Sequence, residues 1–116
     1  HSKIDFAEMA SNYSNSGDKL MREALNIWLN AYGSAAGDLA IQELCYGGLW
    51  IAGGATIKQI KGIKSMTFLK SFRNKGRFSD FVEKLPVMAL IDPESGLFSA
   101  GCRAYFLANE MRKLSE

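Results

Sequence analysis

The chain has 116 residues, of which 47% are hydrophobic and 22% are charged, proportions that suit one globular domain with a modest core. Its net charge of +2 is too small to indicate nucleic acid or an anionic membrane as a partner. Because no apolar run is long enough to span a bilayer and no signal peptide is recognisable, we expect a cytoplasmic protein without a membrane partner.

The first predicted elements are a short helix over residues 4–10, a polar loop, and a long helix capped by Ser16 or Asp18. The long helix should run from Leu20 to about Leu44, because apolar residues recur at intervals of three and four. Its predicted buried stripe consists of Met21, Ala24, Trp28, Ala31, Tyr32, Ala35 and Leu39.

Two glycines, Gly33 and Gly37, interrupt this predicted helix. Each costs about 1 kcal/mol against alanine in a helix interior, so the pattern indicates that a neighbouring backbone approaches closely. Tight packing on a sheet is favoured over direct contact with a ligand.

Two apolar runs predict a pair of strands. Gly47 and Gly48 should end the long helix, and "LWIA" (Leu49 to Ala52) then reads as a short buried strand. "PVMALI" (Pro86 to Ile91) has the same character, with Pro86 at the first strand position, where no ladder hydrogen bond is lost. The residues between the runs have helical period, which predicts a crossover between parallel strands in a β-α-β unit.

A final helix should follow the second strand, with Asp92 as its cap and Pro93 in its first turn. Asp92 is also a candidate site residue at a strand end, but the Asp-Pro pair favours capping. The predicted buried stripe of this helix consists of Leu97, Ala100, Gly101, Ala104, Leu107, Ala108 and Met111.

The order α, β, α, β, α predicts an α/β fold with a sheet of only two strands. A two-stranded sheet has only marginal stability by itself, so we expect the chain to be part of a larger protein or assembly. We expect it to self-associate, or to cover the free edge of the first strand.

No catalytic residue and no metal site is predicted in this segment. Cys45 and Cys102 have neither metal-ligand spacing nor the density of a disulfide scaffold, so both are expected to be reduced and buried. His1 is the sole histidine and stands at the terminus. The carboxylates lie mostly on predicted helices beside basic residues, where no motif would adapt them to acid or base catalysis.

The glycine pair Gly53 and Gly54 is the strongest candidate site. It follows the first predicted strand and precedes a helix, the position at which open α/β sheets bind ligands. A tight turn needs only one glycine, so the second suggests that something outside the chain approaches the backbone. The surrounding "GGATIK" matches neither the P-loop nor the dinucleotide-binding pattern, and as a generic motif it is weak.

A basic segment follows this pair. Seven lysines and arginines lie between Lys58 and Arg77, interleaved with Phe68 and Phe72. They could be drawn as a nucleic-acid surface, but their alternation with apolar residues favours a solvated face of short helices over a sheet. Nucleic acid is therefore the least favoured partner.

Three stretches resemble the C-terminal part of the bacterial glucokinase family: "GDLAIQELCYGGLWIAGGATIKQI", "SFRNKGRFSDFVEKLPVMALID" and "SGLFSAGCRAYF". The likeness runs from about Leu20 to Leu107 and includes "KGRF" at Lys75 to Phe78 and "GLFSAG" at Gly96 to Gly101. The chain departs from the family at Ile57, where the family commonly has proline.

In the superfamily of sugar kinases, actin and heat-shock ATPases, two ribonuclease-H-like domains close over ATP and substrate. The resemblance implies a partial ribonuclease-H-like (actin-like ATPase) domain, with residues 1–92 in the large, ATP-side domain and residues 93–116 as a helix that returns to the small domain. It also implies ATP and Mg²⁺ as cofactors and glucose as the substrate. The homo-oligomer that we expect follows from the two-stranded sheet and not from the resemblance. The nucleotide-binding residues that it implies are Gly53, Gly54, Ala55 and Thr56.

The family's phosphate-binding turn, its Asn-Asp pair with the catalytic base, and its Glu and His sugar ligands all lie upstream of the matched stretch. The resemblance therefore implies a glucokinase fragment that contributes the adenosine-binding wall and is inactive by itself. The alternative is a stand-alone nucleotide-binding or dimerisation module with the same half fold.

Overall fold

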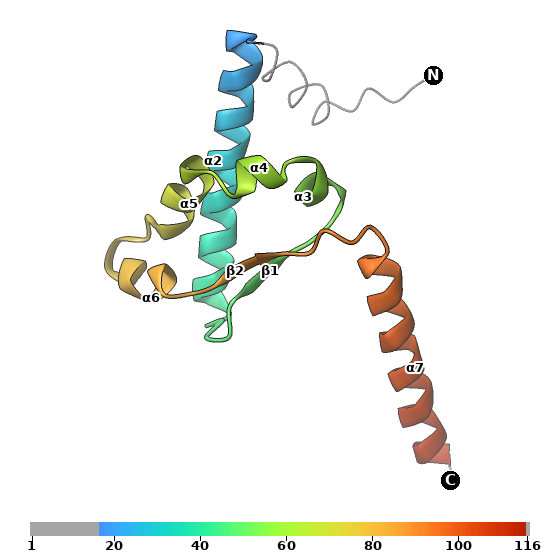
Figure 1. Cartoon of the computed structure of the whole chain (residues 1–116). Helices are drawn as coiled ribbons and strands as arrows, with labels where there is room; N and C mark the ends of the chain where they lie inside the picture. Colours follow the sequence, from blue (N-terminus) through green and yellow to red (C-terminus); the bar gives the residue numbers. More distant parts are fainter. Residues whose placement is uncertain (1–16, 116) are drawn as a thin grey trace.

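The computed structural model describes residues 17–115. Its longest helix is α2 (Lys19–Gln42), and the shorter crossover helices lie beside it (Figure 1). The Asp18 carboxylate caps it by accepting a hydrogen bond from the Met21 N–H at 3.1 Å, which confirms one of the two predicted caps. The other, Ser16, and the short helix predicted over residues 4–10 lie outside the described residues. The helix ends at Gln42, slightly before the predicted end, and Leu44 follows with a φ of +47°.

The buried face of α2 differs from the predicted stripe. Of the predicted residues, Trp28 and Tyr32 are half-buried against each other, with ring centroids 5.1 Å apart, but the side chain of Leu39 is exposed. The prediction was wrong because it followed hydrophobicity, whereas the structure buries the face that carries the smallest side chains. The buried residues are Leu29, Gly33, Ala36, Gly37 and Ala40.

Helix α5 (Met66–Arg73) packs against this small-residue face. A Cβ atom on Gly33 would collide with the backbone carbonyl of Phe68, and a Cβ atom on Gly37 would collide with that of Phe72. The predicted close approach of a neighbouring backbone is therefore confirmed. The neighbour is a helix, however, and not the predicted sheet.

The sheet consists of β1 (Leu49–Ile51) and β2 (Val87–Ala89), which run parallel with Trp50 opposite Met88. β2 begins at Val87, so Pro86 lies one residue before the predicted first strand position, outside the strand. Its carbonyl accepts a hydrogen bond from the Leu49 N–H at 2.9 Å.

The crossover between the two strands is helical throughout, which confirms the predicted β-α-β unit. Its short elements cover one side of the arrangement, next to α2 (Figure 1). They are α3 (Gly54–Lys58), α4 (Ile60–Ile63), α5, the 3-10 helix η1 (Gly76–Phe78) and α6 (Ser79–Glu83).

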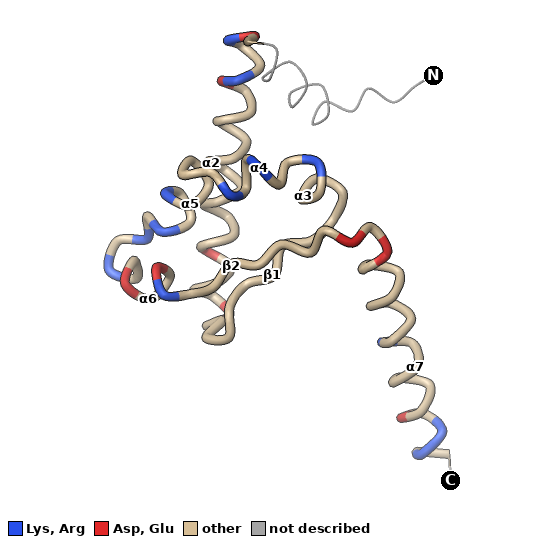
Figure 2. The backbone as a smooth tube through the Cα atoms, viewed as in Figure 1, with Lys and Arg blue, Asp and Glu red and all other residues tan. Residues whose placement is uncertain are grey.

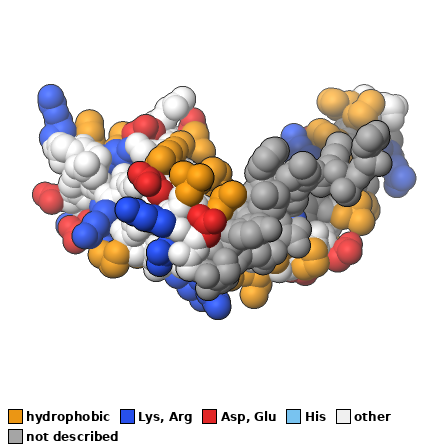
Figure 3. All heavy atoms as spheres, turned by 90° about the horizontal axis from the view of Figure 1, so that it is seen from above, with side chains coloured by type: hydrophobic (Ala, Val, Ile, Leu, Met, Phe, Trp, Pro, Cys, Tyr) orange, Lys and Arg blue, Asp and Glu red, His pale blue; other side chains and the backbone are white. Residues whose placement is uncertain are grey.

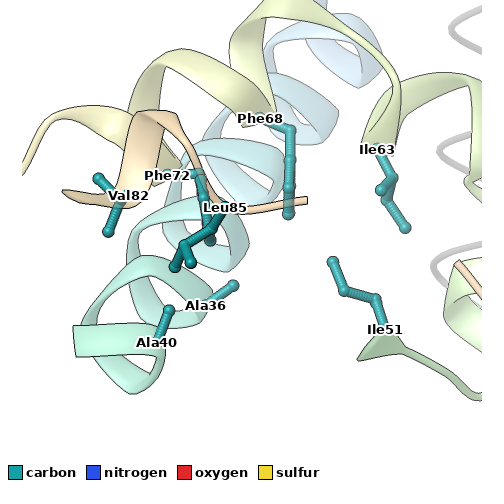
Figure 4. Close-up of a cluster of buried hydrophobic side chains, with 8 residues drawn as sticks. All are labelled: Ala36, Ala40, Ile51, Ile63, Phe68, Phe72, Val82 and Leu85. Carbon is teal, nitrogen blue, oxygen red and sulfur yellow. The ribbon is translucent and has the colours of Figure 1, made fainter. Parts of the chain in front are cut away.

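The hydrophobic core lies where α2, β1 and the crossover helices meet (Figure 4). Ile51 points into this cluster, whereas Trp50, its neighbour on the strand, is 60% exposed. Side chains alternate between the two faces of a strand, so the described chain covers only one face of β1. The core residues are Ala36, Ala40, Ile51, Ile63, Phe68, Phe72, Val82 and Leu85.

The C-terminal helix, α7 (Ser95–Ser115), extends away from the sheet (Figure 1). None of its described residues is buried, so the predicted buried stripe was wrong: Leu97 is 74% exposed and Met111 is 70% exposed. Hydrophobic side chains are visible on the surface of this part of the molecule, at the right of Figure 3. The stripe has helical spacing, but no element within residues 17–115 covers it.

The two cysteines are free thiols, and both are half-buried instead of buried as predicted. Cys45 lies in the loop after α2 and Cys102 lies on the uncovered helix α7. Their partial exposure follows from these positions, because neither belongs to the core cluster.

Most basic residues of this segment are exposed, as predicted. Figure 2 shows their positions along the crossover helices. Lys75 is the exception, with a side chain only 8% exposed. Its Nζ atom donates to the Asp38 carboxylate at 2.6 Å and to the carbonyl and hydroxyl oxygens of Ser34 at 2.8 and 3.2 Å. Three acceptors offset the cost of removing the ammonium group from water, so Lys75 ties the crossover to α2.

The outer edge of β1 has no strand partner within residues 17–115. Because unpaired strand edges and exposed aromatic faces favour association, we expect the chain to self-associate as its concentration rises, measured by sedimentation velocity. Trp50→Lys should weaken association through the sheet, whereas Tyr105→Lys, at a 66% exposed position on α7, tests association through the helix. A monomer at all concentrations would contradict this expectation.

Candidate functional site

A hollow of about 410 Å³ lies at the carboxyl ends of the two parallel strands. One side comes from the turn between β1 and α3, and the other from the segment between β2 and α7. Ligands of open α/β sheets bind at this edge. The lining residues are Ala52, Gly53, Gly54, Ile57, Asp92, Pro93, Ser95 and Gly96.

The glycine pair forms one side of this hollow. Gly53 has φ and ψ of 106° and 170°, a backbone conformation that residues with a side chain rarely adopt. Gly54 is the first residue of α3 and has no such constraint. A Cβ atom on either glycine would meet nothing within 4 Å among the described residues. The backbone therefore faces open space, and packing within the described chain requires neither glycine.

The two other residues of the predicted site, Ala55 and Thr56, do not line the hollow. Ala55 is exposed, and Thr56 is fully buried, with its hydroxyl donating a hydrogen bond to the Ala52 carbonyl at 3.1 Å. Thr56 thus ties the start of α3 to the end of β1. The structure brings Gly53 and Gly54 to the hollow, while the role of Thr56 in it is to hold the turn.

The opposite side of the hollow begins at Asp92. One carboxylate oxygen, Oδ1, accepts a hydrogen bond from the Glu94 N–H at 2.9 Å, and the Asp92 carbonyl accepts one from the Ser95 N–H at 3.2 Å. These bonds form a turn ahead of α7. The predicted cap at Asp92 and the predicted place of Pro93 in the first helical turn were wrong, because α7 begins at Ser95 and the Glu94 carbonyl accepts its first helical hydrogen bond, from the Phe98 N–H at 3.0 Å. Asp92 also lines the hollow, so the turn ahead of α7 and the site share this residue.

Sequence reasoning missed five lining residues, Ala52, Ile57, Pro93, Ser95 and Gly96. Pro93, Ser95 and Gly96 could have been predicted from the rule that ligands bind at the carboxyl ends of parallel strands. These residues follow β2, whose carboxyl end lies at the same edge of the sheet as that of β1. Within residues 17–115 no group of three or more His, Cys, Asp or Glu side chains could hold a metal ion. The same part of the chain contains no helix long and apolar enough to cross a bilayer.

The two parallel strands and their helical crossover define an α/β unit with a glycine-walled hollow at its strand ends. Comparison with protein families gives a match to the glucokinase model over residues 2–106. The chain belongs to the glucokinase family.

Individual relatives agree with this result. The chain is 41% identical over 83 residues to the glucokinase of Trichormus variabilis, covering 72% of this chain and 24% of the relative. The glucokinase of Nostoc punctiforme gives the same identity and coverage. The glucokinase of a Synechocystis species is 35% identical over 98 residues, covering 84% of this chain and 28% of the relative. The chain therefore spans about a quarter of the length of these curated relatives.

Proposed function

We propose that this chain is the C-terminal part of an ATP-dependent glucokinase and that its hollow receives the adenosine of ATP. The complete enzyme would transfer the γ-phosphoryl group of MgATP to the 6-hydroxyl of glucose. The observation that carries the proposal is the space that residues 17–115 leave open in front of Gly53 and Gly54, at the strand edge where α/β folds bind ligands. The volume of the hollow, about 410 Å³, falls within the usual range of ligand sites.

The lining residues suit a nucleoside. A flat purine ring can lie against the backbone of Gly53 and Gly54, because no atom of residues 17–115 would lie within 4 Å of a Cβ atom on either glycine. Ile57 and Pro93 add apolar surface for the ring, and the polar side chains of Asp92 and Ser95 suit the sugar. Adenosine would thus gain burial for the base and hydrogen-bond partners for the ribose.

The proposal extends to the domain organisation. Residues 1–92 would form the C-terminal part of a large, ribonuclease-H-like domain on the ATP side, and residues 93–116 would return to the small domain. The exposed apolar side chains of α7 support this arrangement, because the complete enzyme would bury them against another part of the protein. The unpaired edge of β1 would pair with an upstream strand in the same way.

The chemistry itself requires more than this segment. Phosphoryl transfer depends on positioning and on stabilising the charge of the phosphates, usually with Mg²⁺. Within residues 17–115 the carboxylates form no metal-binding cluster, and Asp92 is the one carboxylate that lines the hollow. The segment would therefore supply binding energy for the nucleoside, while the rest of the enzyme would supply the metal site, the catalytic base and the sugar ligands.

A second candidate function is a nucleotide-binding or dimerisation module that acts without catalysis. The exposed face of α7 and the free edge of β1 favour it, because both are surfaces on which a second copy could dock. This alternative retains the hollow and its nucleoside, so the two candidates differ in whether an enzyme is completed around it.

The proposal predicts that the 116-residue chain binds ADP but phosphorylates no hexose. Isothermal titration with ADP measures the first property, and a coupled assay with glucose and MgATP measures the second. Heat-denatured chain serves as the control for both. Turnover that co-purifies with the chain would contradict the fragment interpretation, and absence of ADP binding would contradict the role of the hollow.

A further inference from the structure

One carboxylate oxygen of Asp92 accepts a hydrogen bond within the described chain, and the other does not. Oδ1 accepts the hydrogen bond from the Glu94 N–H, but Oδ2 has no hydrogen bond or ion pair within residues 17–115. Asp92 is exposed and lines the same hollow as Gly53 and Gly54. Because the bond to Glu94 anchors the carboxylate, the second oxygen has a defined position before any ligand arrives.

The hydrogen-bonding capacity of Oδ2 restricts which ligand group it can contact. An ionised carboxylate only accepts hydrogen bonds, so Oδ2 needs a ligand group that donates one. The apolar surface and bare backbone of the hollow suit the base, which leaves the sugar for the polar side. The 2′- and 3′-hydroxyls of ribose are donors, and a carboxylate acceptor makes a charge-assisted hydrogen bond to such a group.

We propose that Asp92 is a specificity residue that accepts a hydrogen bond from a ribose hydroxyl, so that the hollow prefers ribonucleotides to deoxyribonucleotides. This inference rests on the proposed function, because it assumes a nucleoside in the hollow. Ser95, which also lines the hollow, has a hydroxyl that can both donate and accept, so it discriminates less between a sugar that carries the hydroxyl and one that lacks it.

The test compares the dissociation constants of ADP, 2′-deoxy-ADP, 3′-deoxy-ADP and IDP for this chain, measured by isothermal titration. Removal of the contacted hydroxyl should weaken binding roughly tenfold in the wild-type chain, as expected for one hydrogen bond to a charged group. In Asp92→Ala the ratio of the deoxy to the ribo constant should fall to about one, because the acceptor is gone. In Asp92→Asn the remaining oxygen can still accept from the Glu94 N–H, so this variant keeps the turn ahead of α7.

Asp80→Ala is the matched control, because Asp80 is an exposed carboxylate on α6 that does not line the hollow. It should leave the ratio unchanged. Equal binding of ADP and both deoxy analogues by the wild-type chain would overturn the role of Asp92 while leaving the adenosine site intact. A loss with IDP alone would assign Asp92 to the base and overturn the ribose contact. Absence of ADP binding would overturn the site itself, and with it the proposed function.

Discussion

Gly33→Ala should lower the free energy of unfolding by about 2 to 3 kcal/mol, although helix propensity alone predicts a gain of about 1 kcal/mol. The reason is the backbone carbonyl of Phe68, which occupies the space that the new methyl group needs. A backbone carbonyl in a packed helix cannot rotate aside, so α2 and α5 would have to separate and loosen the contacts around Phe68 and Phe72. Urea denaturation followed by far-UV circular dichroism measures the change.

Gly101→Ala is the matched control for this prediction. Gly101 also lies inside a helix, but a Cβ atom there meets nothing within 4 Å among the described residues. This variant should therefore show the propensity effect alone and increase the helix content of α7. Equal effects of the two substitutions would mean that the α2–α5 contact is looser than the structure shows.

Gly54→Val should raise the dissociation constant for ADP at least about tenfold, which corresponds to about 1.4 kcal/mol of lost binding energy. The valine side chain would project into open space at the hollow, where the base is proposed to lie. Because Gly54 has no unusual φ, stability should change little. In the complete enzyme the same substitution should raise the KM for ATP much more than the KM for glucose.

Gly53→Val separates strain from binding. With φ at +106°, a branched residue at this position should cost about 1 to 3 kcal/mol of stability in addition to any effect on ADP. The expected pattern is thus a binding defect in both variants and a stability defect chiefly in Gly53→Val. Titration with ADP and thermal denaturation of both proteins measure it. An unchanged ADP constant in folded Gly54→Val would show that nucleotide does not contact the glycine pair.

The sequence predicts local features of this fold well. The β-α-β order and the cap at Asp18, one of the two predicted caps, follow from patterns of apolar and capping residues along the chain. The buried face of α2 could not be predicted in this way, because it depends on which helix lies opposite. Gly33 and Gly37 indicated the close contact, but only the structure identifies α5 as the partner.

The burial of charged and apolar side chains also could not be predicted from local sequence patterns. Lys75 looks like its solvated neighbours in the sequence, and its burial depends on Ser34 and Asp38, which lie far away along the chain. The apolar residues of α7 do recur with helical spacing, and the segment is a helix as predicted. Their predicted burial was wrong, because nothing within residues 17–115 packs on them.

The candidate site was predicted in part. A change of period after "LWIA" located Gly53 and Gly54, and the structure places both at the hollow. Ser95 and Gly96 were missed because their segment reads as an ordinary helix start, and their approach to α3 depends on the parallel pairing of β1 with β2. Whether nucleotide contacts Ala55 and Thr56 through their backbone stays a prediction.

The isolation of α7 gives this chain two levels of local stability. Amide groups in α2 and α5 can exchange their hydrogens with solvent only when the core around Phe68 opens, so the free energy of core packing protects them. Those of α7 depend on a helix of 21 residues with no buried side chain, and a helix of that length in water is held by little more than its own backbone hydrogen bonds. Opening of α7 is therefore a local event that leaves the core closed. If another surface packed on α7, its amide hydrogens would exchange more slowly, because α7 would then open only together with that packing.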